Sequence, residues 1–115
     1  MDYTPAQLEE KLEKYCVEVA QKGPEYAEKQ GLFFSVDQRK NDYLAKLTKE
    51  SEGSSNAEKE RNARCSTAWE DFRNDLVQME KEALVAKIAY EISKTKWETA
   101  KSLLYSKNQE RRTNT

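Results

Sequence analysis

The sequence predicts an all-α protein in which two shorter N-terminal helices pack on one long C-terminal helix, as a helical hairpin or coiled-coil-like bundle. Only 3 Gly and 2 Pro occur among 115 residues, so few positions interrupt a helix. Apolar residues make up 37% and charged residues 36% of the chain. In ordinary globular domains about 45–50% of the residues are apolar and about 25% are charged. The composition of this chain therefore favours slender helices with a large exposed surface. An apolar stripe with heptad spacing runs through the second half.

The first helix is predicted by a capping box. Thr4 suits the N-cap position, Pro5 the first helical position, and Gln7 stands three residues after Thr4. Apolar residues then recur every three or four positions, as on the buried face of a helix. The pair Gly23–Pro24 is typical of a helix end, so we expect the first helix to stop there.

A second helix is expected from Pro24 to Glu50, with Gly31 as its candidate interruption. Residues 1–50 then form the N-terminal helical segment. Residues 51–56 read SEGSSN and form the one clear loop, because small polar residues and a glycine disfavour a helix. We expect these parts and the long helix that follows to form one domain overall.

The long helix is predicted over residues 57–110, with 111–115 as a frayed tail. Ser55 suits its N-cap, and no Gly or Pro follows, so an unbroken helix there would be about 80 Å long. Its apolar stripe alternates steps of four and three residues. The positions are Cys65, Trp69, Phe72, Leu76, Met79, Ala83, Ala86, Tyr90, Ser93, Trp97, Ala100 and Leu104. A 3.5-residue period of this length predicts left-handed supercoiled packing.

A second apolar surface lies outside that stripe, where residues 83–92 read ALVAKIAYEI. It comprises Leu84, Val85, Ile88 and Ile92. A helix that is apolar nearly all round is covered on more than one side. A second copy of the chain is the simplest cover, so we expect a homodimer or a higher homo-oligomer. The alternative is cover by the Phe33–Phe34 segment of the same chain.

The charge of the chain is unevenly distributed. The net charge is -1, yet residues 94–115 hold six basic and two acidic side chains. Their basic and aromatic members are candidates for contact with an anionic partner, namely Lys101, Tyr105, Lys107, Arg111 and Arg112. Aromatic faces and cations together bind single-stranded nucleic acid. The alternative is a solvated helix end, where cations complement the helix dipole.

No catalytic, cofactor-binding or metal-binding residue is predicted, so we expect no enzyme. The chain has no His, its glycines are isolated, and Cys16 and Cys65 have no ligand at metal spacing. The two cysteines are expected to be buried structural thiols. Neither a signal peptide nor a membrane span is apparent, which predicts a cytoplasmic protein.

The second half also resembles a family of small helical proteins encoded by bacteriophages and prophages. The matching segments are Glu60–Arg64, Trp69 with Phe72, the Ala-rich stretch Glu82–Tyr90, and Trp97–Leu104. This resemblance implies a viral accessory protein in the host cytoplasm, near replication and recombination functions. It implies no activity and no cofactor.

The sequence leaves three functional hypotheses open, which differ in the kind of partner. The leading hypothesis is a non-enzymatic phage accessory protein that acts through helix-mediated contact with another protein and through self-association. The alternative is a nucleic-acid-binding accessory factor in phage recombination or replication. A structural role, as a component of a virion or a secretion apparatus, is a third possibility.

Overall fold

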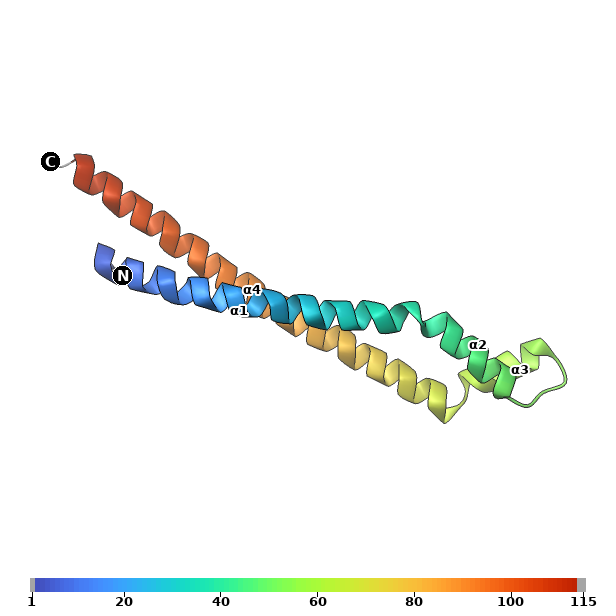
Figure 1. Cartoon of the computed structure of the whole chain (residues 1–115). Helices are drawn as coiled ribbons and strands as arrows, with labels where there is room; N and C mark the ends of the chain where they lie inside the picture. Colours follow the sequence, from blue (N-terminus) through green and yellow to red (C-terminus); the bar gives the residue numbers. More distant parts are fainter. Residues whose placement is uncertain (1, 114–115) are drawn as a thin grey trace. The chain divides into compact units, whose positions relative to one another are not determined.

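The computed structural model describes residues 2–113 and contains four α-helices and no strand in that range (Figure 1). The helices are α1 (Pro5–Gln38), α2 (Lys40–Glu50), α3 (Asn56–Arg64) and α4 (Thr67–Thr113). These helices contain 90% of the residues that the structure describes. The predictions of an all-α fold and of a long C-terminal helix are therefore confirmed.

Helix α1 begins at the predicted capping box. The Thr4 backbone N–H donates to Gln7 Oε1 at 2.9 Å, and the Gln7 backbone N–H donates to Thr4 Oγ1 at 3.2 Å. The predicted end at Gly23–Pro24 is wrong, because α1 continues through both residues and through Gly31 to Gln38. Proline removes one backbone donor from a helix but does not have to end it.

The first helical break instead falls at Arg39, between α1 and α2. Arg39 has φ -90° and ψ 0°, and its N–H donates to the Val36 carbonyl, three residues back, at 3.1 Å. Neither Gly nor Pro is adjacent. This tight turn redirects the backbone without any residue that would announce it in the sequence.

The helix expected over 57–110 is interrupted once, at Cys65 and Ser66. The Ser66 hydroxyl donates to the Ala63 carbonyl at 2.6 Å, and its oxygen accepts from the Trp69 N–H at 3.2 Å. Ser66 thus closes α3 and caps α4 with one side chain. The frayed tail expected at 111–115 is also corrected, since α4 continues to Thr113. Residues 114 and 115 lie outside the described range.

Within the described range the chain divides into two compact units. One unit combines residues 2–27 with 85–113, and we call it the terminal unit. The other comprises residues 28–84, and we call it the central unit. Each unit contains part of α1 and part of α4.

The core of the central unit is aromatic. Leu44, Ala63 and Trp69 are buried, and partly buried Tyr43 and Phe72 pack against them. The ring centroids of Tyr43 and Phe72 are 4.7 Å apart, and those of Trp69 and Phe72 are 5.6 Å apart. Such pairs prefer offset or tilted packing at about 4.5–7 Å. This cluster joins α2, α3 and the first turns of α4.

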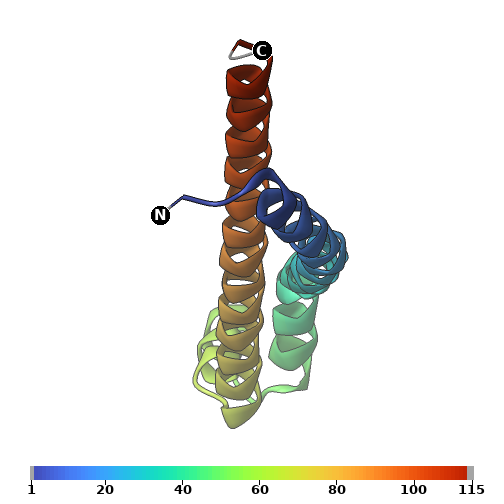
Figure 2. The same cartoon turned by 90° about the vertical axis from the view of Figure 1, so that its left-hand side faces the viewer.

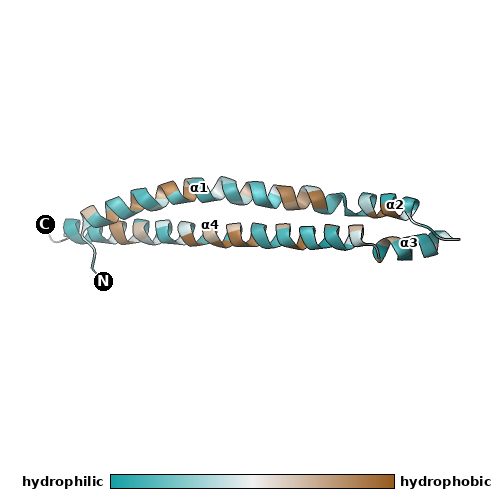
Figure 3. Cartoon of the chain, turned by 90° about the horizontal axis from the view of Figure 1, so that it is seen from below, coloured by the Kyte–Doolittle hydropathy of each residue, from teal (hydrophilic) through white to brown (hydrophobic). Residues whose placement is uncertain are grey.

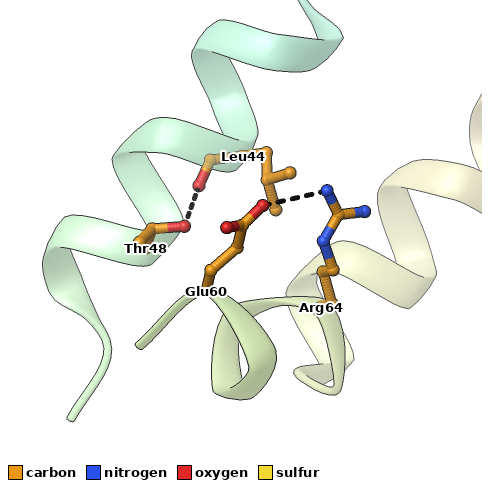
Figure 4. Close-up of polar contacts among 4 residues, drawn as sticks. All are labelled: Leu44, Thr48, Glu60 and Arg64. Carbon is orange, nitrogen blue, oxygen red and sulfur yellow. Dashed lines mark hydrogen bonds and ion pairs between the residues drawn. The ribbon is translucent and has the colours of Figure 1, made fainter. Parts of the chain in front are cut away.

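Helices α2 and α3 form a hairpin within the central unit (Figure 2). The predicted loop lies between them, and the predicted N-cap is confirmed, because Ser55 Oγ accepts from the Glu58 N–H at 3.2 Å. Gly53 has φ +157°, a backbone conformation that side chains disfavour. In Figure 4 the Leu44 side chain points from α2 toward the Glu60–Arg64 ion pair of α3, whose atoms are 3.0 Å apart.

The terminal unit packs α1 against α4 with smaller residues. Leu8 is 1% exposed, and Ala100 and Ser93 are buried. Tyr26 stacks on Tyr90 with ring centroids 6.1 Å apart. The Tyr90 ring also lies 3.4 Å from the point where a Cβ on Gly23 would stand. Gly23 therefore serves as a close-approach residue within the helix and not as its end.

Burial along α4 follows the predicted stripe. From Trp69 to Leu104 every residue of that stripe is buried or half-buried, and all other residues of the segment are exposed except Ala89. Figure 3 shows the corresponding recurrence of hydrophobic residues among hydrophilic ones along the helix. Cys65, the first residue of the predicted stripe, is exposed, as is Cys16. The prediction of buried thiols is therefore wrong: Cys65 lies at the helical break, and Cys16 on an outer face of α1.

Candidate interaction surface

The four residues singled out for self-association are all exposed. Leu84 is 55% exposed, Val85 62%, Ile88 48% and Ile92 51%. Isolated apolar residues are common on protein surfaces and need no explanation. Several half-exposed aliphatic side chains on one helix face within one unit are different, because together they form an apolar strip.

Three of these residues belong to the terminal unit, and the helix places them on one face. Val85, Ile88 and Ile92 stand at positions i, i+3 and i+7 of α4, so they follow one another along the helix surface. Tyr90 and Ser93 face the core of the same unit. The exposed strip and the packed stripe are therefore distinct faces of one helix.

The central unit carries the remaining member, Leu84, and one residue that the sequence reasoning missed. Val77 is 62% exposed and precedes Leu84 by seven residues, which puts both on the same face of α4. That spacing was the signal available in the sequence. Phe34, in the same unit, is 51% exposed. The alternative that Phe33–Phe34 covers the patch is therefore wrong for Leu84.

The candidate residues for anionic contact lie on the last turns of α4, and their cations have contacts within the chain. Lys101 Nζ lies 5.0 Å from the centroid of the Trp97 ring. Lys107 Nζ lies 4.0 Å from Asp2 Oδ1. Tyr105, in contrast, is 66% exposed. The structure therefore does not gather the five residues into one open cationic site.

A groove at this end brings Lys107 and Arg111 beside the start of α1. Pro5, Glu9 and Glu110 also line it. Two carboxylates accompany the two cations, so the lining is balanced in charge. Arg112, the fifth candidate residue, is an exposed residue of the last turn of α4.

A second groove of the terminal unit was not predicted. Lys11 and Tyr15 of α1 line it opposite Lys96 and Leu103 of α4. The sequence held a partial signal, since Leu8, Lys11 and Tyr15 recur at helical spacing. Which residues of α4 face them depends on the packing of α1 against α4, and that is a property of the fold.

The ionisable side chains were examined as candidate metal ligands and for shifted pKa values. In residues 2–113 no group of three or more Cys, Asp or Glu side chains is placed to hold a metal ion. Hydrogen bonds from the Ser54 side chain and backbone lower the pKa of Glu58 below its usual value. The Glu58 carboxylate is thereby part of the α3 cap and serves a structural role. No helix of the described chain is both long and apolar enough to cross a membrane.

Comparisons with protein-family models, with curated proteins and with solved structures found no match to this chain.

Proposed function

We propose that this chain is a non-enzymatic interaction protein that self-associates through the exposed apolar face of α4. The observation that carries the proposal is the strip Val85, Ile88 and Ile92, with each side chain about half exposed on one helix face. Water contact with aliphatic side chains is unfavourable, so a partner surface that covers them gains free energy.

The energetics are compatible with a dimer. Full burial of a Val, Leu or Ile side chain contributes about 1.5–3 kcal/mol. Because these residues are already half buried, three from each of two chains contribute about 5–9 kcal/mol gross. Association costs about 4–15 kcal/mol in lost freedom. A two-fold antiparallel crossing at Ile88 would place the strip on its own copy.

The packed face of α4 supports a coiled-coil-like geometry in the same proposal. The less exposed residues between Trp69 and Leu104 follow alternating steps of three and four. A repeat of 3.5 residues keeps such a stripe against its neighbours only if the helices wind with a left hand. The phage or prophage setting rests on the resemblance of the second half alone.

Sedimentation equilibrium tests the proposal. We expect a dimer at about 100 μM chain, in the range of affinity that this balance allows. Ile88→Glu should return the chain to a monomer with its helical circular dichroism retained, because a buried charge would oppose association. Lys87→Glu, at the exposed position just before Ile88, is the matched control and should leave the dimer intact. A monomeric wild-type chain at that concentration would refute self-association.

The second candidate is a nucleic-acid-binding accessory factor. It is favoured by the exposed Tyr105 beside the basic last turns of α4. Removal of residues 107–115 should then abolish a salt-dependent gel shift with single-stranded DNA, while the helical content stays high. An unchanged shift after this deletion would remove the support for the candidate.

A further inference from the structure

The groove between α1 and α4 in the terminal unit has the form of a docking site. Its volume is about 210 Å³, and its floor includes Leu8 and Ala100, both buried. Tyr3, Tyr15 and Leu103 form apolar walls. The volume suits one or two large side chains.

The two walls run along helices, which gives the groove a length and a direction. On α1, Leu8, Lys11 and Tyr15 lie at i, i+3 and i+7. On α4, Thr95, Thr99 and Leu103 lie at steps of four. Eight residues at 1.5 Å each extend about 12 Å, or two helical turns. A groove between two packed helices commonly binds a third, amphipathic helix.

The charged residues that line the groove are all positive. Lys11 on α1 has its Nζ 4.7 Å from the centroid of the Tyr3 ring, and Lys96 on α4 has its Nζ 5.9 Å from that of Tyr15. Each helix thus contributes one cation, and none of the described residues that line this groove carries a carboxylate. The groove at the end of α4 differs, because Glu9 and Glu110 balance its cations.

We infer that this groove binds an acidic amphipathic helix of a partner protein. Apolar side chains of that helix enter between Tyr3, Tyr15 and Leu103, and carboxylates on its two edges pair with Lys11 and Lys96. Each lysine lies over a tyrosine ring, and this cation–π contact places its ammonium group at the edge of the groove. This inference is independent of the proposed self-association, which uses Val85, Ile88 and Ile92.

Single-stranded nucleic acid fits this groove less well. Nucleic-acid binding needs several cations for phosphates and open aromatic faces for bases. The terminal unit carries ten basic and nine acidic side chains in residues 2–27 and 85–113, so it has no strong positive field. A lysine of the chain itself already lies over each of the two tyrosine rings.

Fluorescence anisotropy with model peptides tests the inference. The probe is a fluorescein-labelled helical peptide of about 14 residues, with leucines at i, i+4 and i+7 and glutamates on both flanks, long enough to span the groove. A second peptide has lysine in place of every glutamate, and oligo(dT) of similar length is the third probe. We expect the acidic peptide to bind more tightly than the basic one.

Charge reversal locates the site. Lys11→Glu with Lys96→Glu should weaken the acidic peptide at least about tenfold, because two attractive pairs become repulsive. Lys14→Glu with Lys94→Glu is the matched control, since both residues are exposed outside the groove, and it should change binding less than about twofold. Lys11→Gln with Lys96→Gln removes the two positive charges without reversing them, and Gln has the same shape as Glu. This pair should give an intermediate loss of peptide binding, and it keeps the test valid if the double reversal disturbs the fold.

Four results would overturn the inference. One is no binding of the acidic peptide at about 1 mM, the weakest affinity that a docking groove of this size would show. Another is equal weakening by the control pair. The third is preferential binding of oligo(dT) that the groove reversals abolish, which would assign the groove to nucleic acid. The fourth is loss of peptide binding in the Ile88→Glu variant but not in the groove reversals, which would place the peptide on the self-association face.

Discussion

The central and terminal units hold their helices together with different residues. In the central unit, Trp69, Phe72 and Tyr43 stack between α2, α3 and α4, and Trp69 is 6% exposed. In the terminal unit the buried residues are Leu8, Ser93 and Ala100. Small residues let two helices approach but do not fill the space beside them. The central unit therefore has an aromatic core, whereas the terminal unit packs small residues beside Leu8 and has a groove between α1 and α4.

The largest effect should come from the aromatic core. Trp69→Ala should cost about 3–5 kcal/mol of unfolding free energy, the usual range for removal of a buried aromatic side chain. Its ring contacts both Tyr43 and Phe72, so the cavity cannot close easily. Urea denaturation measures the loss, with the exposed Lys81→Ala as a control that should cost less than about 0.5 kcal/mol. Equal midpoints for the two variants would show that the cluster is not a core.

The terminal unit should lose less from its most buried side chain. Leu8→Ala should cost about 2–4 kcal/mol of unfolding free energy, because the Leu8 side chain is buried. Leu8 also lies at the floor of the groove, so neighbouring side chains can move into part of the space that the substitution leaves. The same urea series gives the value. A loss greater than that of Trp69→Ala would reverse the ranking of the two units.

Removal of the Ser66 hydroxyl should have a smaller effect at the junction of α3 and α4. Ser66→Ala loses the cap on the Trp69 N–H and the bond to the Ala63 carbonyl, which together should cost about 1–2 kcal/mol. Ser66→Asp retains an acceptor for the Trp69 N–H and should recover part of the loss. If Ser66→Ala is instead stabilising, α3 and α4 form one helix through this position.

The smallest effects should come from the helical glycines, one in each unit. Gly31→Ala should stabilise by about 0.5–1 kcal/mol, because no atom lies within 4 Å of the added methyl group and Ala favours the helix. Gly23→Ala should gain less, since its methyl would stand 3.4 Å from the Tyr90 ring. Thermal melts of both variants check this. Destabilisation by Gly23→Ala of more than about 1 kcal/mol would indicate a helix end at Gly23, as the sequence suggested.

The sequence by itself determined the helical fold and the pattern of burial along the long helix. These follow from local and periodic properties: few Gly and Pro, caps at Thr4 and Ser55, and apolar residues in steps of three and four. The exposed strip at Ile88 was also readable, because residues off the packed stripe must face outward. Each of these depends on the geometry of a single helix, which the order of residues specifies directly.

Only the tertiary structure decided where the helices break and which residues of different helices meet. Gly23–Pro24 has the local signal of a helix end, but the packing of Tyr90 against Gly23 accompanies a continuous α1. Arg39 has no such signal, and yet the chain turns there. Lys11 and Lys96 are 85 positions apart in the sequence and line one groove. Such contacts depend on how α1 and α4 pack, because the gain from side-chain packing can outweigh local preferences of about 1–3 kcal/mol.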